Sequence, residues 1–291
     1  MMPRSAICLV AYLACVNSFA PVGSIASRPP TQLSVKTALD PQEWRQFTVK
    51  EITPLSHDTK KFTVALPSEE HELGMVTASC LMVEGTGLDG TSQVARPYTP
   101  TSLNGTKGHF ELVIKKYDKG QVSSYMHGLS VGDAIKVKGP FPKIKLDPNM
   151  KKRIGLIAGG TGITPMYQCI QELLEADGDA TEMVLLYGNK TPKDILLKSE
   201  LDALATKYPR FSVVYKVGEA TDGWTGPVGH IGLEDCKQYL PPPSDDHMVF
   251  VCGPPPLMKA ISGDKGPDKS QGAVDGVLKE LGYTETQVYK F

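Results

Sequence analysis

The chain has 291 residues, enough for about two domains of ordinary size. Hydrophobic residues make up 41% and charged residues 22%, and the formal net charge of -1 gives no reason to expect a nucleic-acid partner. The six cysteines form no CxxC pair and no Cys/His cluster with metal-ligand spacing. The sequence therefore predicts neither a metal site nor a disulfide framework.

The N-terminal region has the composition of a targeting sequence. The apolar run from Ala6 to Val16 is too short to span a bilayer, since a spanning helix needs about 20 residues. Residues 1–18 therefore predict a signal peptide, and residues 19–40, which contain basic and hydroxyl residues but no acid before Asp40, have transit-peptide chemistry. This two-part arrangement is similar to the plastid presequences of algae with complex plastids. A plain secretory signal leading to the endoplasmic reticulum, or a short membrane anchor, is the alternative.

Residues 41–147 predict a small antiparallel barrel. Apolar and polar residues alternate with the period of a half-buried strand in Trp44–Ile52, Lys60–Leu66, His109–Tyr117 and Asp133–Pro140. Glycine and proline punctuate these runs, and short strands separated by turn signals are typical of barrels. Gln121–Leu129 is expected to form a short helix within this domain.

Residues 148–291 predict a doubly wound α/β domain, after a polar, proline-marked boundary at Lys145–Lys152. Arg153–Gly160 is a continuous apolar run that ends in glycines, as expected for a buried parallel strand. Further apolar runs alternate with helical patterns, which implies parallel strands connected by helices. The expected strands are Glu182–Gly188, Phe211–Val217 and His247–Gly253, and the expected helices are Pro165–Glu175 and Ile195–Tyr208.

Three short motifs contain the residues suited to a nucleotide cofactor. R-P-Y-T-P-T-S, Arg96–Ser102, combines a guanidinium that suits a phosphate with an aromatic ring and several hydroxyls. A-G-G-T-G-I-T-P, Ala158–Pro165, and V-C-G-P-P-P-L-M, Val251–Met258, each lead from a predicted parallel strand into a helix. Ligands bind at such carboxyl ends, and the amides of a helix N-terminus stabilise a pyrophosphate.

The ordered motifs R-P-Y-T-P-T-S, V-I-K-K-Y, G-Q-V-S-S-Y, G-G-T-G-I-T-P and C-G-P-P-P-L-M, with a terminal phenylalanine, resemble the NADH–cytochrome b5 reductases. These enzymes are a branch of the ferredoxin–NADP reductase-like flavoenzymes, and the resemblance covers about Trp44–Phe291. It implies an all-β antiparallel FAD-binding barrel over residues 41–147, followed by an α/β doubly wound NAD-binding domain over residues 148–291. The implied reaction is hydride transfer from NADH to FAD, followed by single-electron transfer to cytochrome b5 or a similar acidic carrier.

The resemblance also implies roles for individual residues. Arg96 would pair with the FAD pyrophosphate, Tyr98 would lie against the flavin, and Thr99 would hydrogen-bond near the reacting flavin nitrogen. The other residues expected around FAD are Pro97, Ile114, Lys115, Tyr117, Gly120, Gln121, Val122, Ser123 and Thr164. Those expected on the nicotinamide side are Gly160, Thr161, Gly162, Cys252, Gly253, Pro254 and Phe291. Thr99 and Cys252 are the expected catalytic residues.

The choice between NADH and NADPH stays open at this point. Animal members of the family carry an acidic residue after the third α/β strand, where this chain has Gly218 followed by Glu219. Lys190 could attract the extra phosphate of NADPH, and a plastid setting would favour that cofactor. The family resemblance favours NADH, which is the expectation here.

The electron acceptor is also open. Residues 115–153 hold ten basic and three acidic side chains. Such a face would steer an acidic carrier, either cytochrome b5 or ferredoxin, to the enzyme, which is expected to be a monomer. A plastid ferredoxin–NADP reductase-like enzyme that uses NADPH is one alternative, although those enzymes usually end in tyrosine. A non-catalytic flavin-binding docking subunit is the alternative of another class.

Overall fold

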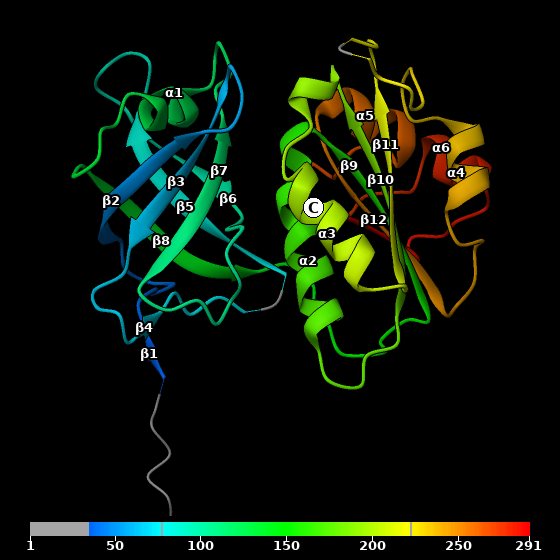
Figure 1. Ribbon diagram of the computed structural model, residues 1–291, viewed down its shortest axis with the longest axis horizontal. Helices are drawn as coiled ribbons and strands as arrows, with labels where there is room; N and C mark the ends of the chain where they lie inside the picture. Colours follow the sequence, from blue (N-terminus) through cyan, green and yellow to red (C-terminus); the bar gives the residue numbers. More distant parts are fainter. Residues whose placement is uncertain (1–34, 77, 222) are drawn as a thin grey trace, which may run out of the picture. The chain divides into compact units, whose positions relative to one another are not determined.

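The computed structural model describes residues 35–291 except Thr77 and Asp222. The expected signal peptide and most of the expected transit segment therefore lie outside the described residues. An all-β part is followed along the chain by an α/β part (Figure 1). No helix within the described residues is long and apolar enough to cross a membrane.

The first part is a six-stranded antiparallel sheet with the order β6-β5-β8-β2-β3-β7. Along β2 the side chains of Phe47 and Val49 are buried and their neighbours are exposed, so the alternation predicted from the sequence is confirmed. Helix α1 (Gln121–His127) contacts both edge strands and thereby links the two edges of the sheet. The strands are β2 (Arg45–Pro54), β3 (Thr59–Ala65), β5 (Ser79–Thr86), β6 (Gln93–Tyr98), β7 (His109–Lys115) and β8 (Ala134–Pro142).

The folded chain begins before residue 41, the expected start of the barrel domain. Strand β1 (Lys36–Thr37) pairs with β4 (His71–Glu72), and Ala38 and Leu39 are buried in the barrel core with exposed fractions of 1% and 7%. These residues were expected to belong to the transit-like segment. The sequence pattern did not reveal their role, because a two-residue strand and two apolar residues are too short to show a period.

The second part is a five-stranded parallel sheet with the order β11-β10-β9-β12-β13, which confirms the doubly wound prediction. The strands are β9 (Arg153–Gly159), β10 (Glu182–Asn189), β11 (Phe211–Val217), β12 (His247–Cys252) and β13 (Val288–Lys290). The helices are α2 (Ile163–Glu175), α3 (Lys198–Lys207), α4 (Leu233–Tyr239), α5 (Pro255–Ile261) and α6 (Gly276–Glu280). Helices α2 and α3 share one buried cluster with the sheet, and α4, α5 and α6 share another (Figure 1).

The helix expected over Ile195–Tyr208 starts three residues later than predicted, at Lys198. A 3-10 turn, Pro192–Asp194, precedes it, and Leu197 has a left-handed backbone with φ of 56°. This reorientation of the chain separates the turn from the helix. Asp194 ends the 3-10 turn and belongs to the site described below.

The sheet order creates a switch point at β9. The chain goes from β9 to β10 on one side and later returns to place β12 on the other side. In open α/β sheets, ligands bind in the crevice outside the carboxyl ends of the strands at this point. Here those ends carry the motifs Ala158–Pro165 and Val251–Met258.

Candidate functional site

The turns after β9 and β12 touch each other through their backbones. A Cβ atom added at Gly162 would lie 2.2 Å from the carbonyl oxygen of Cys252, so only glycine permits this approach. Gly160 has a φ of 52° and nothing within 4 Å of an added Cβ, so the space above it is open. Both glycines are expected on the nicotinamide side. The structure assigns Gly162 to contact between the turns and leaves the open position at Gly160.

Cys252 ends β12 beside this contact and is partly buried. Burial raises the pKa of its thiol to about 12, so the group is neutral at physiological pH. A neutral thiol is a packing surface rather than a charged nucleophile. Gly253 and Pro254 then turn the chain into α5.

The first turn of α1 offers free donors near Arg96. The amides of Gln121, Val122 and Ser123 have no intrahelical acceptor, and no side chain caps the helix. Arg96 lies on β6, which α1 contacts, and its side chain is exposed. A guanidinium and a set of amides in neighbouring elements provide the donors that a diphosphate requires.

The side chains of several expected cofactor residues support the fold around the start of α1. The Ser123 hydroxyl donates to the Gly120 carbonyl and accepts from the Tyr117 amide, so it stabilises the turn that presents the amides. The side chains of Val122 and Ile114 are buried in the barrel core, each 1% exposed. The sequence could not separate these supporting roles from direct contact, since both occur in one motif.

Tyr98 follows Arg96 and Pro97 on β6 and precedes Thr99. Burial, with a smaller effect of the nearby Tyr117 hydroxyl, raises the pKa of Tyr98 to about 12. Tyr98 therefore keeps its proton and offers an aromatic face and a neutral hydroxyl. Thr99 is partly buried, which leaves part of its surface accessible beside this ring.

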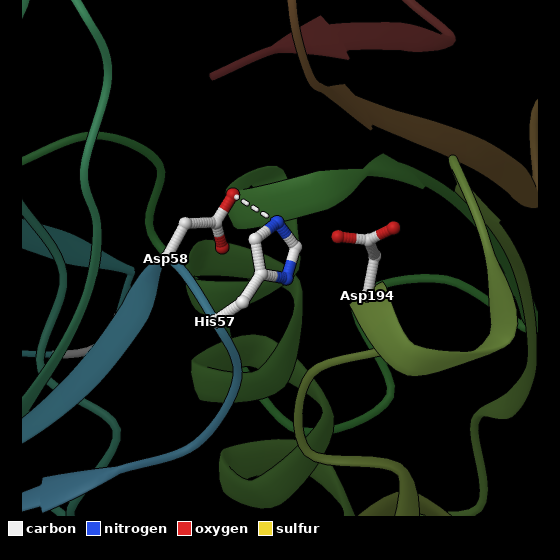
Figure 2. Close-up of side chains that lie close together, drawn as sticks. All are labelled: His57, Asp58 and Asp194. Carbon is white, nitrogen blue, oxygen red and sulfur yellow. Dashed lines mark ion pairs between the residues drawn. The ribbon is translucent and has the colours of Figure 1, made fainter.

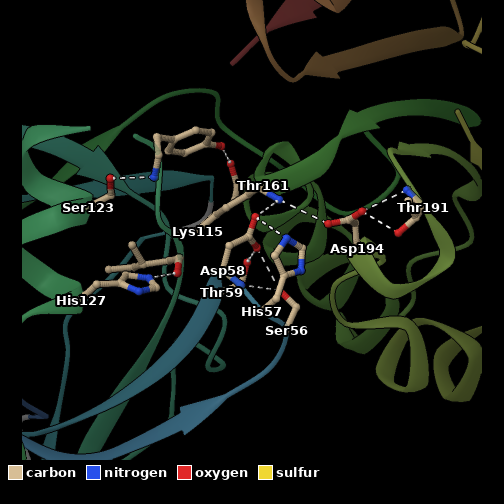
Figure 3. Close-up of polar contacts among 12 residues, drawn as sticks. Ser56, His57, Asp58, Thr59, Lys115, Ser123, His127, Thr161, Thr191 and Asp194 are labelled. Carbon is tan, nitrogen blue, oxygen red and sulfur yellow. Dashed lines mark hydrogen bonds and ion pairs between the residues drawn. The ribbon is translucent and has the colours of Figure 1, made fainter. Parts of the chain in front are cut away.

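Two contacts join the barrel to the α/β part at this place (Figure 3). In the first, the Tyr117 hydroxyl lies 2.9 Å from Thr161 Oγ1. Within the α/β part, Thr164, which is 8% exposed, donates to the Thr161 carbonyl. Tyr117 itself is 51% exposed, so it is not a core residue. Residues expected on the FAD side and on the nicotinamide side are thus in direct contact.

Lys115 forms the second link. Its Nζ lies 2.7 Å from Asp58 Oδ2 in the barrel and 3.5 Å from Asp194 Oδ1 in the α/β part. Asp194 also accepts a hydrogen bond from the Thr191 hydroxyl at 2.7 Å. Lys115 is therefore a partly buried cation that bridges the two parts, rather than a solvated strand charge.

The pKa values of this group follow from its ion pairs. Burial alone would raise the pKa of Asp58 and of Asp194, but hydrogen bonds from Lys115, Thr59 and Thr191 outweigh burial and lower both. Burial would lower the pKa of Lys115, but the two carboxylates outweigh it and raise the value. All three groups are therefore charged at neutral pH.

His57, Asp58 and Asp194 also have the side chains of a metal site. One candidate ligand atom from each lies within 4.8 Å of the others, and His57 Nε2 is 3.3 Å from Asp58 Oδ2 (Figure 2). However, the ammonium of Lys115 contacts both carboxylates and supplies the positive charge there. We therefore interpret the cluster as an ion-pair network.

Phe291 lies beside the end of β12. Its amide donates to the Val251 carbonyl at 2.9 Å, and its ring packs edge-on against Phe250 and Tyr289, with centroids 5.8 and 4.9 Å away. The backbone bond to Val251 places Phe291 next to Cys252. Phe291 and Cys252, two of the residues expected on the nicotinamide side, are therefore neighbours in the fold.

The site residues fit FAD and a nicotinamide dinucleotide. Arg96 and the α1 amides suit a diphosphate, Tyr98 suits a flat ring, and the turns after β9 and β12 lie at the sheet's switch point. The fold and site therefore define a two-domain flavoprotein oxidoreductase.

Comparisons with known proteins identify the family. Residues 46–146 match the family described as "Oxidoreductase FAD-binding domain", and residues 156–263 match "Oxidoreductase NAD-binding domain". The chain is 47% identical over 261 residues to the NADH-cytochrome b5 reductase-like protein of Arabidopsis thaliana, covering 88% of this chain and 79% of that protein. It is 46% identical over 257 residues to NADH-cytochrome b5 reductase 2 of Kluyveromyces lactis, covering 88% and 86%.

A solved structure agrees with these relatives. The cytochrome b5 reductase domain of Ulva prolifera nitrate reductase has a TM-score of 0.76 and 34% identity, and the match covers 88% of this chain and all of that one. The chain belongs to the NADH–cytochrome b5 reductase family.

The sequence interpretation missed His57, Asp58 and Asp194. Thr191 and Asp194 have the spacing of a helix-start capping box, which could have marked the turn. Nothing local indicates that Asp58 and Asp194 meet at Lys115, because the three residues come from separate segments.

Replacing Arg96 by alanine should lower FAD occupancy. The change would remove the phosphate contact expected of Arg96. Charge-assisted contacts of this kind contribute about 1.5–3 kcal/mol, so the dissociation constant should rise about 10- to 150-fold. The flavin-to-protein absorbance ratio after purification measures the effect. Arg153→Ala is the control, because Arg153 begins β9 at the end away from the turn at Gly160. This variant should keep full FAD occupancy. Unchanged FAD affinity in Arg96→Ala would refute the assignment.

Replacing Asp194 by asparagine should destabilise the protein by about 1–3 kcal/mol at pH 7, because it removes one carboxylate from a partly buried ion pair. The pKa of Asp194 is lower in the folded state than in the unfolded state. Its contribution to stability is therefore fully present above the unfolded-state pKa and is lost as the pH falls through the folded-state pKa. The difference in thermal unfolding midpoint between wild type and Asp194→Asn should be constant from pH 7 to about pH 5 and should become smaller below about pH 4.

Glu234→Gln is the control for this experiment, since Glu234 is 85% exposed in its ion pair with Lys237 and such pairs contribute little. An Asp194→Asn midpoint equal to wild type at pH 7 would show that the bridge adds no stability.

Proposed function

We propose that this protein oxidises NADH through bound FAD and passes single electrons to cytochrome b5. The observation that carries the proposal is the contact of Tyr117 with Thr161, which joins the FAD-side residues to the nicotinamide-side residues. Hydride transfer requires the reacting atoms to lie about 3–3.5 Å apart, so the two half-sites must adjoin.

The residues of the chain bind and orient the reactants. Arg96 and the α1 amides would hold the diphosphate, and Tyr98 and Thr99 would hold the flat ring. Cys252, as a neutral thiol, and Phe291 shape the nicotinamide side without supplying a proton. FAD, when bound, supplies the redox chemistry that links two-electron transfer from NADH to one-electron transfer to the acceptor.

The acceptor is proposed to dock beside Tyr117, where Lys116 and Lys119 are exposed. The basic run 115–153 is less free than its sequence suggests, because Lys115, Lys136, Lys145 and Arg153 form ion pairs with carboxylates. The remaining positive charge suits an acidic carrier and would make its association faster at low ionic strength.

Steady-state kinetics with NADH and NADPH, each against cytochrome b5 and ferredoxin, tests this function. We expect the highest kcat/KM for NADH with cytochrome b5. Preference for NADPH with ferredoxin would instead support the ferredoxin–NADP reductase-like alternative. Absence of flavin reduction by either nucleotide would support the docking subunit.

The preference for NADH should increase in Gly218→Asp. Gly218 follows β11, and an added Cβ would lie 3.4 Å from the Lys190 carbonyl, so a side chain fits with little adjustment. A carboxylate there would repel the extra phosphate of NADPH, and the NADH-to-NADPH ratio of kcat/KM should rise about tenfold. Gly218→Ala adds the Cβ without the charge and should leave the ratio near wild type. An unchanged ratio in Gly218→Asp would place that phosphate elsewhere.

We further propose that residues preceding the barrel direct the protein into a plastid. Because Ala38 and Leu39 are buried in the barrel core, cleavage is expected before Lys36. Sequencing of the N-terminus of protein from the native cell should therefore give a start between Phe19 and about Lys36. A mature chain that retains Ala6–Val16 in a membrane fraction would contradict the proposal and support an anchor.

A further inference from the structure

Strand β13, which ends one residue before Phe291, is too short to hold its position alone. It has three residues at the edge of the sheet and pairs only with β12. Chain ends fray unless other contacts hold them. The position of Phe291 beside Cys252 therefore requires an additional constraint.

The segment Ser262–Asp275, between α5 and α6, supplies that constraint at Lys290. The side chain of Gln271 accepts from the Lys290 amide at 2.6 Å and donates to the Lys290 carbonyl at 3.1 Å. Lys265 Nζ donates to the same carbonyl at 2.9 Å. Both backbone groups of the penultimate residue are thus bound by side chains of one loop.

The side chain of Lys290 makes the reverse connection. Lys290 is 1% exposed, and its Nζ donates to the backbone carbonyls of Asp264 at 3.1 Å and Ala273 at 2.7 Å. Burying an ammonium that contacts only neutral acceptors costs free energy. Burial here lowers the pKa of Lys290. The loop and the terminal strand therefore hold each other through five hydrogen bonds.

This connection is adjacent to the nicotinamide side. Val251 pairs with Lys290 and accepts from the Phe291 amide, and Cys252 follows directly. A displacement of Lys290 would therefore move the Phe291 ring.

We propose that Gln271, Lys265 and Lys290 form a clamp that positions Phe291 beside Cys252 for hydride transfer from NADH. The three are positioning residues, since they act through Phe291. The proposal rests on the NADH-oxidising function above and adds the residues that set the geometry of its nicotinamide side.

The first test measures the clamp without catalysis. Gln271→Met has similar size, removes two of the five bonds and leaves the C-terminal sequence unchanged. Carboxypeptidase A should release Phe291 from the FAD-loaded variant at least about fivefold faster than from wild type, because release follows the population of the frayed end. Lys265→Met should act in the same direction, and Lys259→Met, exposed on α5, should match wild type.

The second test links the clamp to the reaction. Stopped-flow reduction of the flavin by NADH should be about tenfold slower in Gln271→Met at unchanged FAD content, since small misplacements of reacting groups are costly. In a chain that lacks Phe291, the same substitution should cause no further change. A general structural defect would instead slow reduction in both backgrounds.

Wild-type release of Phe291 from both Gln271→Met and Lys265→Met would overturn the clamp. Faster release with a wild-type reduction rate would also overturn it, since the position of Phe291 would then not matter. Failure of the proposed function would look different, because wild-type protein itself would show no flavin reduction by NADH.

Discussion

The approach of Gly162 to the Cys252 carbonyl is the constraint on which the site depends. It holds the turn after β9 against the turn after β12, at the place where the sheet order reverses. Any side chain at Gly162 would push the two turns apart. The start of α2 and the thiol of Cys252 are held close together by this backbone contact.

Contacts between the barrel and the α/β part bring the other half of the site to the same place. The bridge of Lys115 to Asp58 and Asp194 is ionic and partly buried, and the bond of Tyr117 to Thr161 is neutral and exposed. Val113 from the barrel also belongs to the buried cluster around α2. Packing and charge together thus hold the residues expected around the flavin close to those expected around the nicotinamide.

The sequence predicted those elements whose patterns are long and continuous. The apolar runs Arg153–Gly160 and Phe211–Val217 became β9 and β11, and the alternation around Phe47 and Val49 became β2. Shorter features were missed or shifted. Lys36–Leu39 joined the barrel, and α3 began at Lys198 because the left-handed Leu197 reorients the chain, which no periodicity records.

The sequence alone determined the two-domain order, the fold class, the family and the motifs that hold the cofactor candidates, because these depend on local periodicity and on residue spacing. Tertiary structure alone decided which members of each motif present a side chain and which, like Ser123 and Ile114, support the fold. It also decided that Lys115 meets Asp58 and Asp194, and that Gln271 binds Lys290. These partners come from separate segments, so only the packing of the folded chain brings their charges and hydrogen-bonding groups within reach.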